Sequence, residues 1–295
     1  MTATRTEESF GLLQEVTALV DWSPAGAEPI RLAENDLWRL QNDTVVRIAR
    51  AGQRMAAARE VAVARWLADN DVPAVRPLPI EQPVCVRDRA ATFWELLPPH
   101  VHGTEADLAP LLRRLHSLSK PLFPIGRLQP FVRIAERLTA SESLQGDDRQ
   151  WLFSRLEELQ QDWDDLPAGR PECVIHGDAW GGNCAVTAEG ARLMDFERTS
   201  VGPPEWDLTS TAVAYDTFGK LTAAQYKTYC DLYGYDVRSW AGYPTLRGIR
   251  ELRLVTFAFQ IADHDANAFG QAQYRVQCLR GLRGPRPWNW EAVGG

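Results

Sequence analysis

The sequence has few cysteines, very little lysine and no long apolar run. Its five cysteines are odd in number and form no C-x-x-C pair, which argues against a disulfide or zinc framework. No apolar run approaches the roughly 18 residues that a membrane-spanning helix needs, and the first residues lack the apolar core of a signal peptide. We therefore expect a cytoplasmic protein with no membrane partner.

An excess of positive charge is also missing. The formal net charge is −7, and the 295 residues are 45% hydrophobic and 24% charged, a composition typical of globular proteins. Binding to nucleic acid would favour a basic face, so the composition argues against nucleic acid as the main partner. A chain of this length can form one large or two modest domains.

The clearest chemical pattern lies in residues 173–197, which read CVIHGDAWGGNCAVTAEGARLMDFE. Apolar residues on both sides of a turn at 188–190 predict a β-hairpin. Closing this hairpin brings Asn183 and Asp195 side by side at its open end, and Asp178 lies in the loop that leads into it. Mg²⁺ takes oxygen ligands of these kinds together with substrate phosphates. Asp178 is left to accept a proton from a hydroxyl, as phosphoryl transfer of the kinase type requires.

The same residues resemble a known family. His176-Gly177-Asp178, then Asn183, then Asp195-Phe196-Glu197 are similar to the catalytic and metal loops of the aminoglycoside phosphotransferase and choline kinase family. The resemblance implies an α+β, protein-kinase-like bilobal fold, with a small β-rich nucleotide-binding lobe at 1–98 and a larger, mainly helical catalytic and substrate-binding lobe at 99–295. It also implies ATP or GTP with Mg²⁺ as cofactors, and a small hydroxylated substrate that can be cationic.

The amino-terminal part lacks the lysine with which kinases hold the phosphates. Two alternating runs around residues 41–43 predict a hairpin without a glycine-rich phosphate loop. No lysine precedes Lys120, so Arg47 is the candidate cation on this hairpin. A helix predicted at 54–69 carries Glu60, which would orient Arg47. The alternatives are that Arg47 points outward from an edge strand, and that Glu60 pairs with a neighbouring arginine on the helix surface.

The next segment contains two more predicted strands and a hinge. The strands lie around 84–86 and 92–97, and Pro98-Pro99 closes the segment. The resemblance implies that the backbone of Glu95 and Leu97 holds the adenine edge of the nucleotide. The chain then turns helical, with helices predicted at 105–119, 130–144, 147–165, 222–234, 244–265 and 267–283.

Several residues are candidates for support or for acceptor binding. Asp207, in the segment GPPEWDL, resembles the aspartate that opens a helix and braces the catalytic loop, and His176 has a supporting role in the same loop. Asp263 and Asp265 either grip ammonium groups of an amino sugar or are the solvated acids of a helix end. Trp180 either stacks on a sugar ring or packs beneath the loop, and Glu197 either joins the metal ligands or touches the substrate.

These patterns predict ATP-dependent phosphorylation of a hydroxyl on a small polar molecule. The acceptor we expect first is an aminoglycoside-type antibiotic or an amino sugar. The alternatives are a metabolic kinase of the choline, sugar or ketosamine type and a nucleotide-binding regulator without catalysis. A protein kinase is disfavoured, because only about seven residues separate Glu197 from Glu205, too few for an activation segment.

Overall fold

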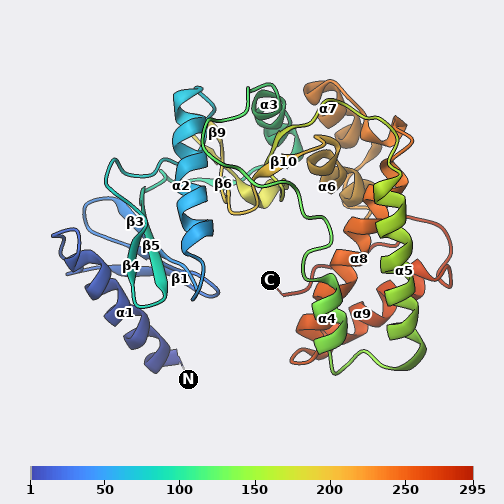
Figure 1. Ribbon diagram of the computed structural model, residues 1–295, viewed down its shortest axis with the longest axis horizontal. Helices are drawn as coiled ribbons and strands as arrows, with labels where there is room; N and C mark the ends of the chain where they lie inside the picture. The colour runs from blue at the N-terminus through green and yellow to red at the C-terminus, as the bar shows by residue number, and fades with distance from the viewer. Residues whose placement is uncertain (1, 295) are drawn as a thin grey trace. The chain divides into compact units, whose positions relative to one another are not determined.

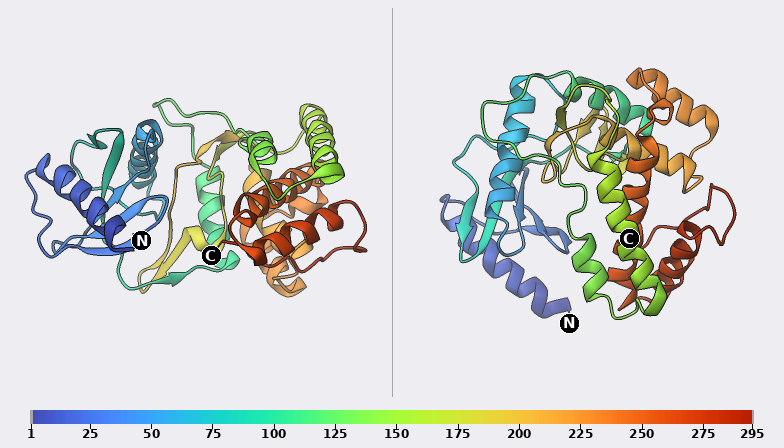
Figure 2. Two further views of the ribbon diagram at one scale, coloured as in Figure 1. Left: turned by 90° about the horizontal axis from the view of Figure 1, so that it is seen from below. Right: turned by 45° about the vertical axis from the view of Figure 1, so that its right-hand side comes forward.

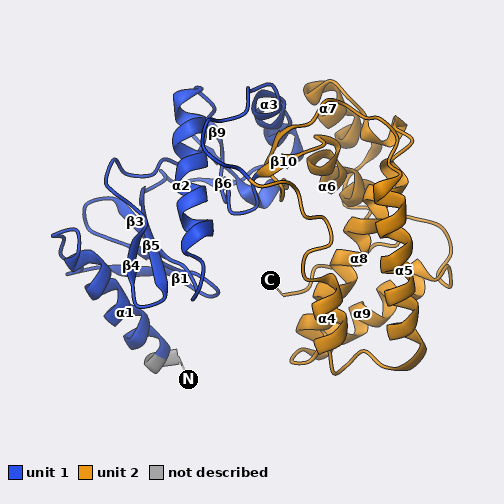
Figure 3. Ribbon diagram, viewed as in Figure 1, with its two compact units in different colours: residues 1–125, 181–199 blue, residues 126–180, 200–295 orange. Residues whose placement is uncertain are grey.

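The structure is a computed structural model that describes residues 2–294. The chain forms two compact units, shown in Figure 3. Unit 1 consists of residues 1–125 and 181–199, and unit 2 consists of residues 126–180 and 200–295. Each unit is therefore built from two separate stretches of sequence. The lobes at 1–98 and 99–295 stay a prediction.

Unit 1 is centred on a five-stranded antiparallel sheet with the strand order β1-β2-β3-β5-β4. The hairpin predicted around residues 41–43 is confirmed, since Asp36 pairs with Ile48 and Arg39 pairs with Val45. Successive side chains of a strand alternate between the two faces of a sheet. The strands are β1 Glu28–Leu32, β2 Asp36–Arg39, β3 Thr44–Ile48, β4 Val84–Val86 and β5 Arg89–Glu95.

Two helices belong with this sheet, as Figure 1 shows. Helix α1, Thr2–Ala18, packs the fully buried Leu13 and Val16 into one hydrophobic core with Val46 and Phe93. Helix α2, Arg54–Asp69, contacts β5 and has the bounds that its alanine-rich sequence predicts. Its buried residues include Glu60, a charged side chain that would be costly to bury without a partner.

The rest of unit 1 includes the predicted catalytic hairpin. Strands β8 and β9 pair antiparallel from Cys184↔Leu193 to Thr187↔Gly190, so this prediction is confirmed. Gly190, in the tight turn, has a φ of 120°, which a side chain would strain. The elements are β6 Val101–His102, α3 Glu105–His116, the 3₁₀ turn η1 Gly181–Asn183, β8 Cys184–Thr187 and β9 Gly190–Leu193, with the sheet order β6-β8-β9.

Unit 2 is mainly helical and is organised around α8, Tyr243–Ala262, which contacts α4, α5, α6 and α9 (Figures 1 and 2). Its buried residues Leu246, Ile249, Leu252 and Val255 lie at the centre of the core of this unit. Among the residues that the structure describes, no helix combines the length and the apolar character that crossing a membrane requires. The remaining elements are α4 Ile134–Ala140, α5 Gly146–Asp164, β7 Cys173–Ile175, β10 Ser200–Gly202, α6 Glu205–Asp216, α7 Ala223–Tyr233, η2 Val237–Ser239 and α9 Ala266–Leu279.

Candidate active site

The loop that carries Asp178 follows β7 in unit 2, and Asp207 holds its backbone. The N–H of His176 donates to Oδ2 of Asp207 at 2.7 Å, and the N–H of Gly177 donates to Oδ1 at 2.8 Å. Bonds to a carboxylate are stronger than bonds between neutral groups, and Asp207 is fully buried. Gly177 has a φ of 84°, a conformation that glycine adopts without steric cost. The bracing contact expected of Asp207 is therefore present.

Two further contacts fix the same loop. The indole N–H of Trp206 donates to the carbonyl of Gly177 at 3.1 Å. The N–H of Asp178 points to Nδ1 of His176 at 3.4 Å, and His176 is fully buried. Because α6 supplies both Trp206 and Asp207, the first turn of one helix sets the path of the loop.

Asp178 also meets an arginine that the sequence patterns did not reveal. Nη1 and Nη2 of Arg250, on α8, each lie 3.4 Å from Oδ1 of Asp178. The side chains are 17% and 33% exposed, respectively, so the pair is partly shielded from water. Arg250 follows Asp178 by 72 residues. The sequence signal for Arg250 was a series of arginines three residues apart, Arg247, Arg250 and Arg253. By itself, such a series is typical of the solvated face of a helix.

The residues predicted to bind the metal lie in unit 1, at the open end of the hairpin. Asn183 ends η1, and its carbonyl accepts the N–H of Met194 at 3.0 Å, next to Asp195. Asp195 has a φ of 63°, an unusual conformation for a residue with a side chain and one that clusters at functional sites. The convergence of Asn183 and Asp195 with Asp178 joins residues of different units, and it stays a prediction.

The donor chemistry of Asn183 and Asp195 fits a hard cation. An amide oxygen and a carboxylate are the ligand types that Mg²⁺ accepts, and it usually keeps waters or phosphate oxygens as further ligands. Across residues 2–294 no three His, Cys, Asp or Glu side chains are placed so that they could hold a metal ion.

The predicted phosphate-binding arginine is held by two carboxylates. Arg47 projects from β3, and its Nη1 forms an ion pair with Oε2 of Glu60 on α2. Its Nη2 lies 3.1 Å from Oε2 of Glu197. The Arg47 and Glu60 side chains are only 15% and 5% exposed. Since β3 is the central strand of the sheet, the alternatives of an edge-strand Arg47 and a surface Glu60 are wrong.

Glu197 and a nearby cavity complete this part of unit 1. The carbonyl of Glu197 accepts a hydrogen bond from Nη2 of Arg59 on α2. The segment after Asp195 is therefore held at the main chain of Glu197 by α2 and at the Glu197 carboxylate by Arg47 of β3. The structure thus places the Glu197 carboxylate on Arg47, and its role toward metal or substrate stays a prediction. The cavity beside these residues has a volume of only about 10 Å³ and is lined by Glu34, Asn35, Arg47, Ala49, Arg50, Gln53, Ala56, Ala57, Glu60 and Glu197.

Arg50 is a second cation that the sequence patterns missed. Its Nη1 lies 3.2 Å from Oε1 of Glu34, and its backbone N–H donates to Oδ1 of Asn35 at 3.2 Å. Both partners lie in the turn between β1 and β2. Side chains therefore fix this turn and add a positive charge to the cavity that contains Arg47.

The predicted adenine-binding backbone lies at the end of β5. The N–H of Glu95 donates to the carbonyl of Arg76 at 2.9 Å, and the N–H of Leu96 donates to the carbonyl of Asp43 at 2.8 Å. The N–H of Glu95 is therefore already bonded within the protein. The assignment of Glu95 and Leu97 to the adenine edge stays a prediction.

The candidates for acceptor binding have varied surroundings. Asp263 accepts N–H groups from Ser143 at 2.9 Å and from Glu142 at 3.3 Å. Partial burial raises the pKa of Asp263, but the hydrogen bonds from Ser143 and Glu142 outweigh this effect and lower it below 3.8. Asp265 caps α9. These structural contacts match the helix-end alternative, and the substrate role of both aspartates stays a prediction.

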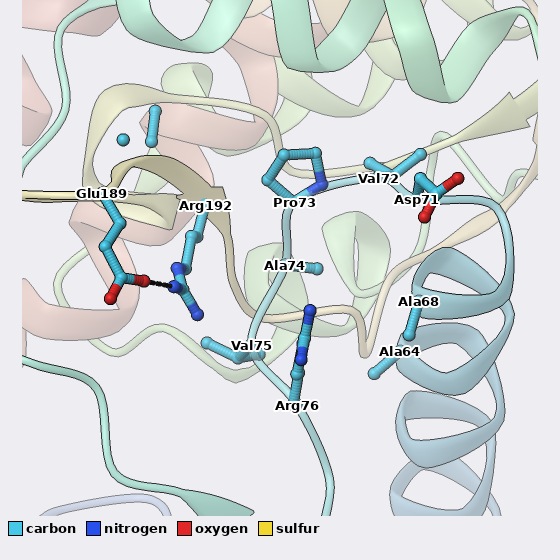
Figure 4. A pocket seen from close by; sticks show the side chains of 12 residues that line it. Ala64, Ala68, Asp71, Val72, Pro73, Ala74, Val75, Arg76, Glu189 and Arg192 are labelled. Atoms are coloured by element: carbon cyan, nitrogen blue, oxygen red, sulfur yellow. Dashed lines mark hydrogen bonds and ion pairs between the residues drawn. The ribbon is translucent and has the colours of Figure 1, made fainter.

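Trp180 is 54% exposed, so the expectation that it packs beneath the loop is wrong. A cavity of about 380 Å³, shown in Figure 4, contains none of the predicted site residues. It lies in unit 1 between Ala64 and Ala68 of α2, the segment 71–76 and the hairpin turn 189–192. The predicted chemistry therefore does not use this cavity.

Known proteins share the sequence pattern and the fold of this chain. The sequence pattern of the phosphotransferase enzyme family matches residues 26–249. No curated protein matches the chain. A choline/ethanolamine kinase family protein from Mesorhizobium loti has a similar structure, with a TM-score of 0.66, 19% identity and coverage of 94% of each chain.

Two more solved structures are similar. The choline kinase LicA from Streptococcus pneumoniae has a TM-score of 0.63 and 16% identity, over 91% of this chain and 98% of that one. An aminoglycoside phosphotransferase from Streptomyces rimosus has a TM-score of 0.56 and 19% identity, over 81% of this chain and 97% of that one. Fold and family pattern together define a phosphotransferase enzyme with an α+β, protein-kinase-like fold. The chain belongs to the phosphotransferase enzyme family.

Proposed function

We propose that the enzyme transfers the γ-phosphoryl group of ATP, or of GTP, to a hydroxyl of a small polar molecule. The observation that carries this proposal is the Arg47–Glu60 ion pair on the central strand, extended by Glu197 at 3.1 Å. A guanidinium held in one direction by two carboxylates suits the positioning of the α- and β-phosphates of a nucleotide. Similar proteins support the choice of cofactor: LicA has been solved with AMP, and the Streptomyces rimosus enzyme with ADP and streptomycin.

The chemistry assigned to the chain is positioning and proton transfer. Asp178 accepts the proton of the acceptor hydroxyl while the hydroxyl oxygen bonds to the γ-phosphorus of ATP. The bond between the γ-phosphorus and the oxygen that bridges it to the β-phosphate breaks, and ADP is released. Asp207, Trp206 and Arg250 hold the loop and the carboxylate of Asp178 in place. Asn183 and Asp195 would hold Mg²⁺, which supplies neutralisation of phosphate charge.

Two classes of acceptor fit this reaction. The first is an aminoglycoside-type antibiotic or an amino sugar, and the second is a metabolic alcohol such as a choline-like compound, a sugar or a ketosamine. The comparisons support both equally, because choline kinases and aminoglycoside phosphotransferases have similar folds at similar identity.

A coupled assay of ADP release tests the proposal. The purified enzyme is given ATP and Mg²⁺ with a panel of aminoglycosides, amino sugars, sugars and choline-like alcohols. We expect acceptor-dependent ADP release that disappears in Asp195→Ala, because the variant lacks a predicted metal ligand. Arg192→Ala in the same hairpin is the control, since the Arg192 side chain forms its ion pair with the exposed Glu189 and has no assigned role in the site. Failure of the wild-type protein to bind ATP would overturn the proposal.

A further inference from the structure

Helix α8 carries three arginines spaced three residues apart, and two of them have structural partners. Arg247 lies 3.7 Å from Asp216, and its guanidinium carbon lies 5.4 Å from the centre of the Tyr243 ring. Arg253 donates to the carbonyl of Pro130 at 2.9 Å. Arg250 differs from both, because its partner is Asp178, the residue to which the proposed function assigns the proton transfer.

The contact between Arg250 and Asp178 is loose. Both Nη atoms approach the same oxygen at 3.4 Å, whereas a charge-assisted bond to a carboxylate is normally about 2.7–2.9 Å long. In the part of the chain that the structure describes, the Arg250 guanidinium has no other carboxylate or carbonyl partner. A guanidinium has five N–H donors arranged to grip a carboxylate or phosphate through two bonds. Arg250 therefore has donors to spare, directly beside the assigned base.

Three acids that lie on α8, at its end or in contact with it are already paired. Asp216 contacts Arg238 and Arg247, and the fully buried Glu251 forms two bonds with Arg286. Asp263 binds the main chain of another segment. A cationic group of the acceptor that approaches Arg250 would meet its positive charge, whereas an anionic group would find a partner with N–H donors to spare.

We propose that the acceptor is a hydroxy compound with a carboxylate or phosphate group beside the hydroxyl, and that Arg250 binds this anionic group. This proposal rests on the proposed function, because it takes Asp178 as the proton acceptor. It makes Arg250 the residue that determines acceptor class. We then expect cationic amino sugars to have a lower kcat/KM than sugar acids, sugar phosphates and hydroxy acids.

Acceptors with the same carbon skeleton and different charged groups test the proposal. One series is glycerate, glycerol 3-phosphate, glycerol and serinol, and the other is glucuronate, glucose 6-phosphate, glucose and glucosamine. We expect the wild-type enzyme to have at least a tenfold higher kcat/KM for an anionic member than for the neutral and cationic members of its series. The anionic member of each series with the higher kcat/KM shows whether Arg250 binds a carboxylate or a phosphate group.

Substitutions of Arg250 then show whether this residue creates the preference. Arg250→Gln should lower kcat/KM for the anionic acceptor about 100-fold, chiefly through KM, because a shielded charged pair is lost. Its effect on the neutral acceptor should be several-fold and should fall on kcat. Arg250→Lys should restore part of the preference, and Arg250→Glu should invert it toward serinol or glucosamine. Arg247→Gln, on the same helix, is the control that should keep the preference.

The proposal and the function on which it rests can fail separately. Two results would overturn the acceptor class and leave the proposed kinase function standing. One is acceptor-dependent ADP release without charge preference, and the other is an equal loss of kcat/KM for all acceptors in Arg250→Gln. ADP release by no acceptor would count against the proposed function. Calorimetry with AMP-PNP at saturation then decides the acceptor class: binding of an anionic member that Arg250→Gln abolishes supports it, and no binding of any anionic member overturns it.

Discussion

Two arginine–carboxylate pairs of this protein differ in how completely they are made. In unit 1, Arg47 lies between Glu60 and Glu197, and the Glu60 side chain is only 5% exposed. In unit 2, Arg250 reaches one oxygen of Asp178 at 3.4 Å, and Asp178 is 33% exposed. The first cation is fixed by two partners, while the second has a single loose one.

The two arginines suit different functions, the positioning of phosphates and the recognition of the acceptor. A guanidinium locked between two carboxylates keeps one direction whether or not a nucleotide is present, which suits the positioning of phosphates. A guanidinium with spare donors can take on a second anion, which suits recognition of a variable acceptor. Substitutions should therefore affect the two pairs differently, in stability as well as in activity.

The largest effect is expected at the carboxylate of the loose pair. Asp178→Asn removes the proton acceptor with little change of shape, so kcat should fall about 10³-fold, within the usual range for general-base catalysis. The affinity for nucleotide should stay within about twofold, because Asp178 has no assigned nucleotide contact. ADP release and calorimetric titration with AMP-PNP measure the two quantities. Turnover equal to that of the wild type would refute the base assignment.

The tight pair should show its largest effect in stability. Glu60→Gln removes the charge of a buried partner of Arg47, so the free energy of unfolding should fall by about 3 kcal/mol. KM for ATP should rise about tenfold, because Arg47 loses part of its orientation. Urea denaturation and steady-state kinetics measure these changes.

The matched variant Arg250→Gln should lower the free energy of unfolding by less than about 1 kcal/mol, because its pair is loose and partly exposed. Equal losses of stability in Glu60→Gln and Arg250→Gln would contradict the comparison.

The hydrogen bonds by which Asp207 holds the loop at 176–178 can be tested separately from the charge of Asp178. Asp207→Asn leaves one oxygen to accept the two N–H groups of His176 and Gly177, so one bond is lost and the other is weakened. We expect the free energy of unfolding to fall by about 2 kcal/mol and kcat to fall about tenfold at an unchanged KM for ATP. Thermal unfolding and kinetics check this expectation. A changed KM for ATP with an unchanged kcat would place the effect on the nucleotide side instead.

The smallest effect concerns the pH dependence of stability. The hydrogen bonds that lower the pKa of Asp263 below 3.8 favour its charged form in the folded state. This contribution is present above pH 3.8 and is lost as the pH falls through the lower pKa of the folded protein. Asp263→Asn should therefore lower Tm by no more than about 3 °C at pH 6, and the difference should shrink toward pH 3. The exposed Asp162→Asn is the control, and a difference that grows on acidification would contradict the assignment.

Most of the local structure could be predicted from the sequence. The helix at 54–69, the catalytic hairpin and the hairpin around residues 41–43 arise from apolar periodicity and turn residues, which act between near neighbours in the chain. Helix ends were less predictable. The helix expected at 130–144 spans only Ile134–Ala140, because Arg133 has a φ of 63° and Ser141 is extended.

The candidate site could be predicted only in part. The pairing of Arg47 with Glu60 followed from their spacing on a strand and the next helix. The contact of Arg47 with Glu197 and that of Arg250 with Asp178 join residues 150 and 72 positions apart. No pattern in a single sequence marks such partners. The exposure of Trp180 and the main-chain contacts of Asp263 are likewise set by how distant segments pack.

By itself, the sequence predicted the type of chemistry, since Asp178, Asn183 and Asp195 have residue types and a spacing that resemble the catalytic and metal loops of the family. The tertiary structure decided which charges surround these residues. Folding placed α8 against the loop at 176–178 and thereby set Arg250 beside Asp178. The physical reason is range: hydrogen bonding and apolar periodicity act over a few residues, whereas the surroundings of a charge depend on every segment that packs around it.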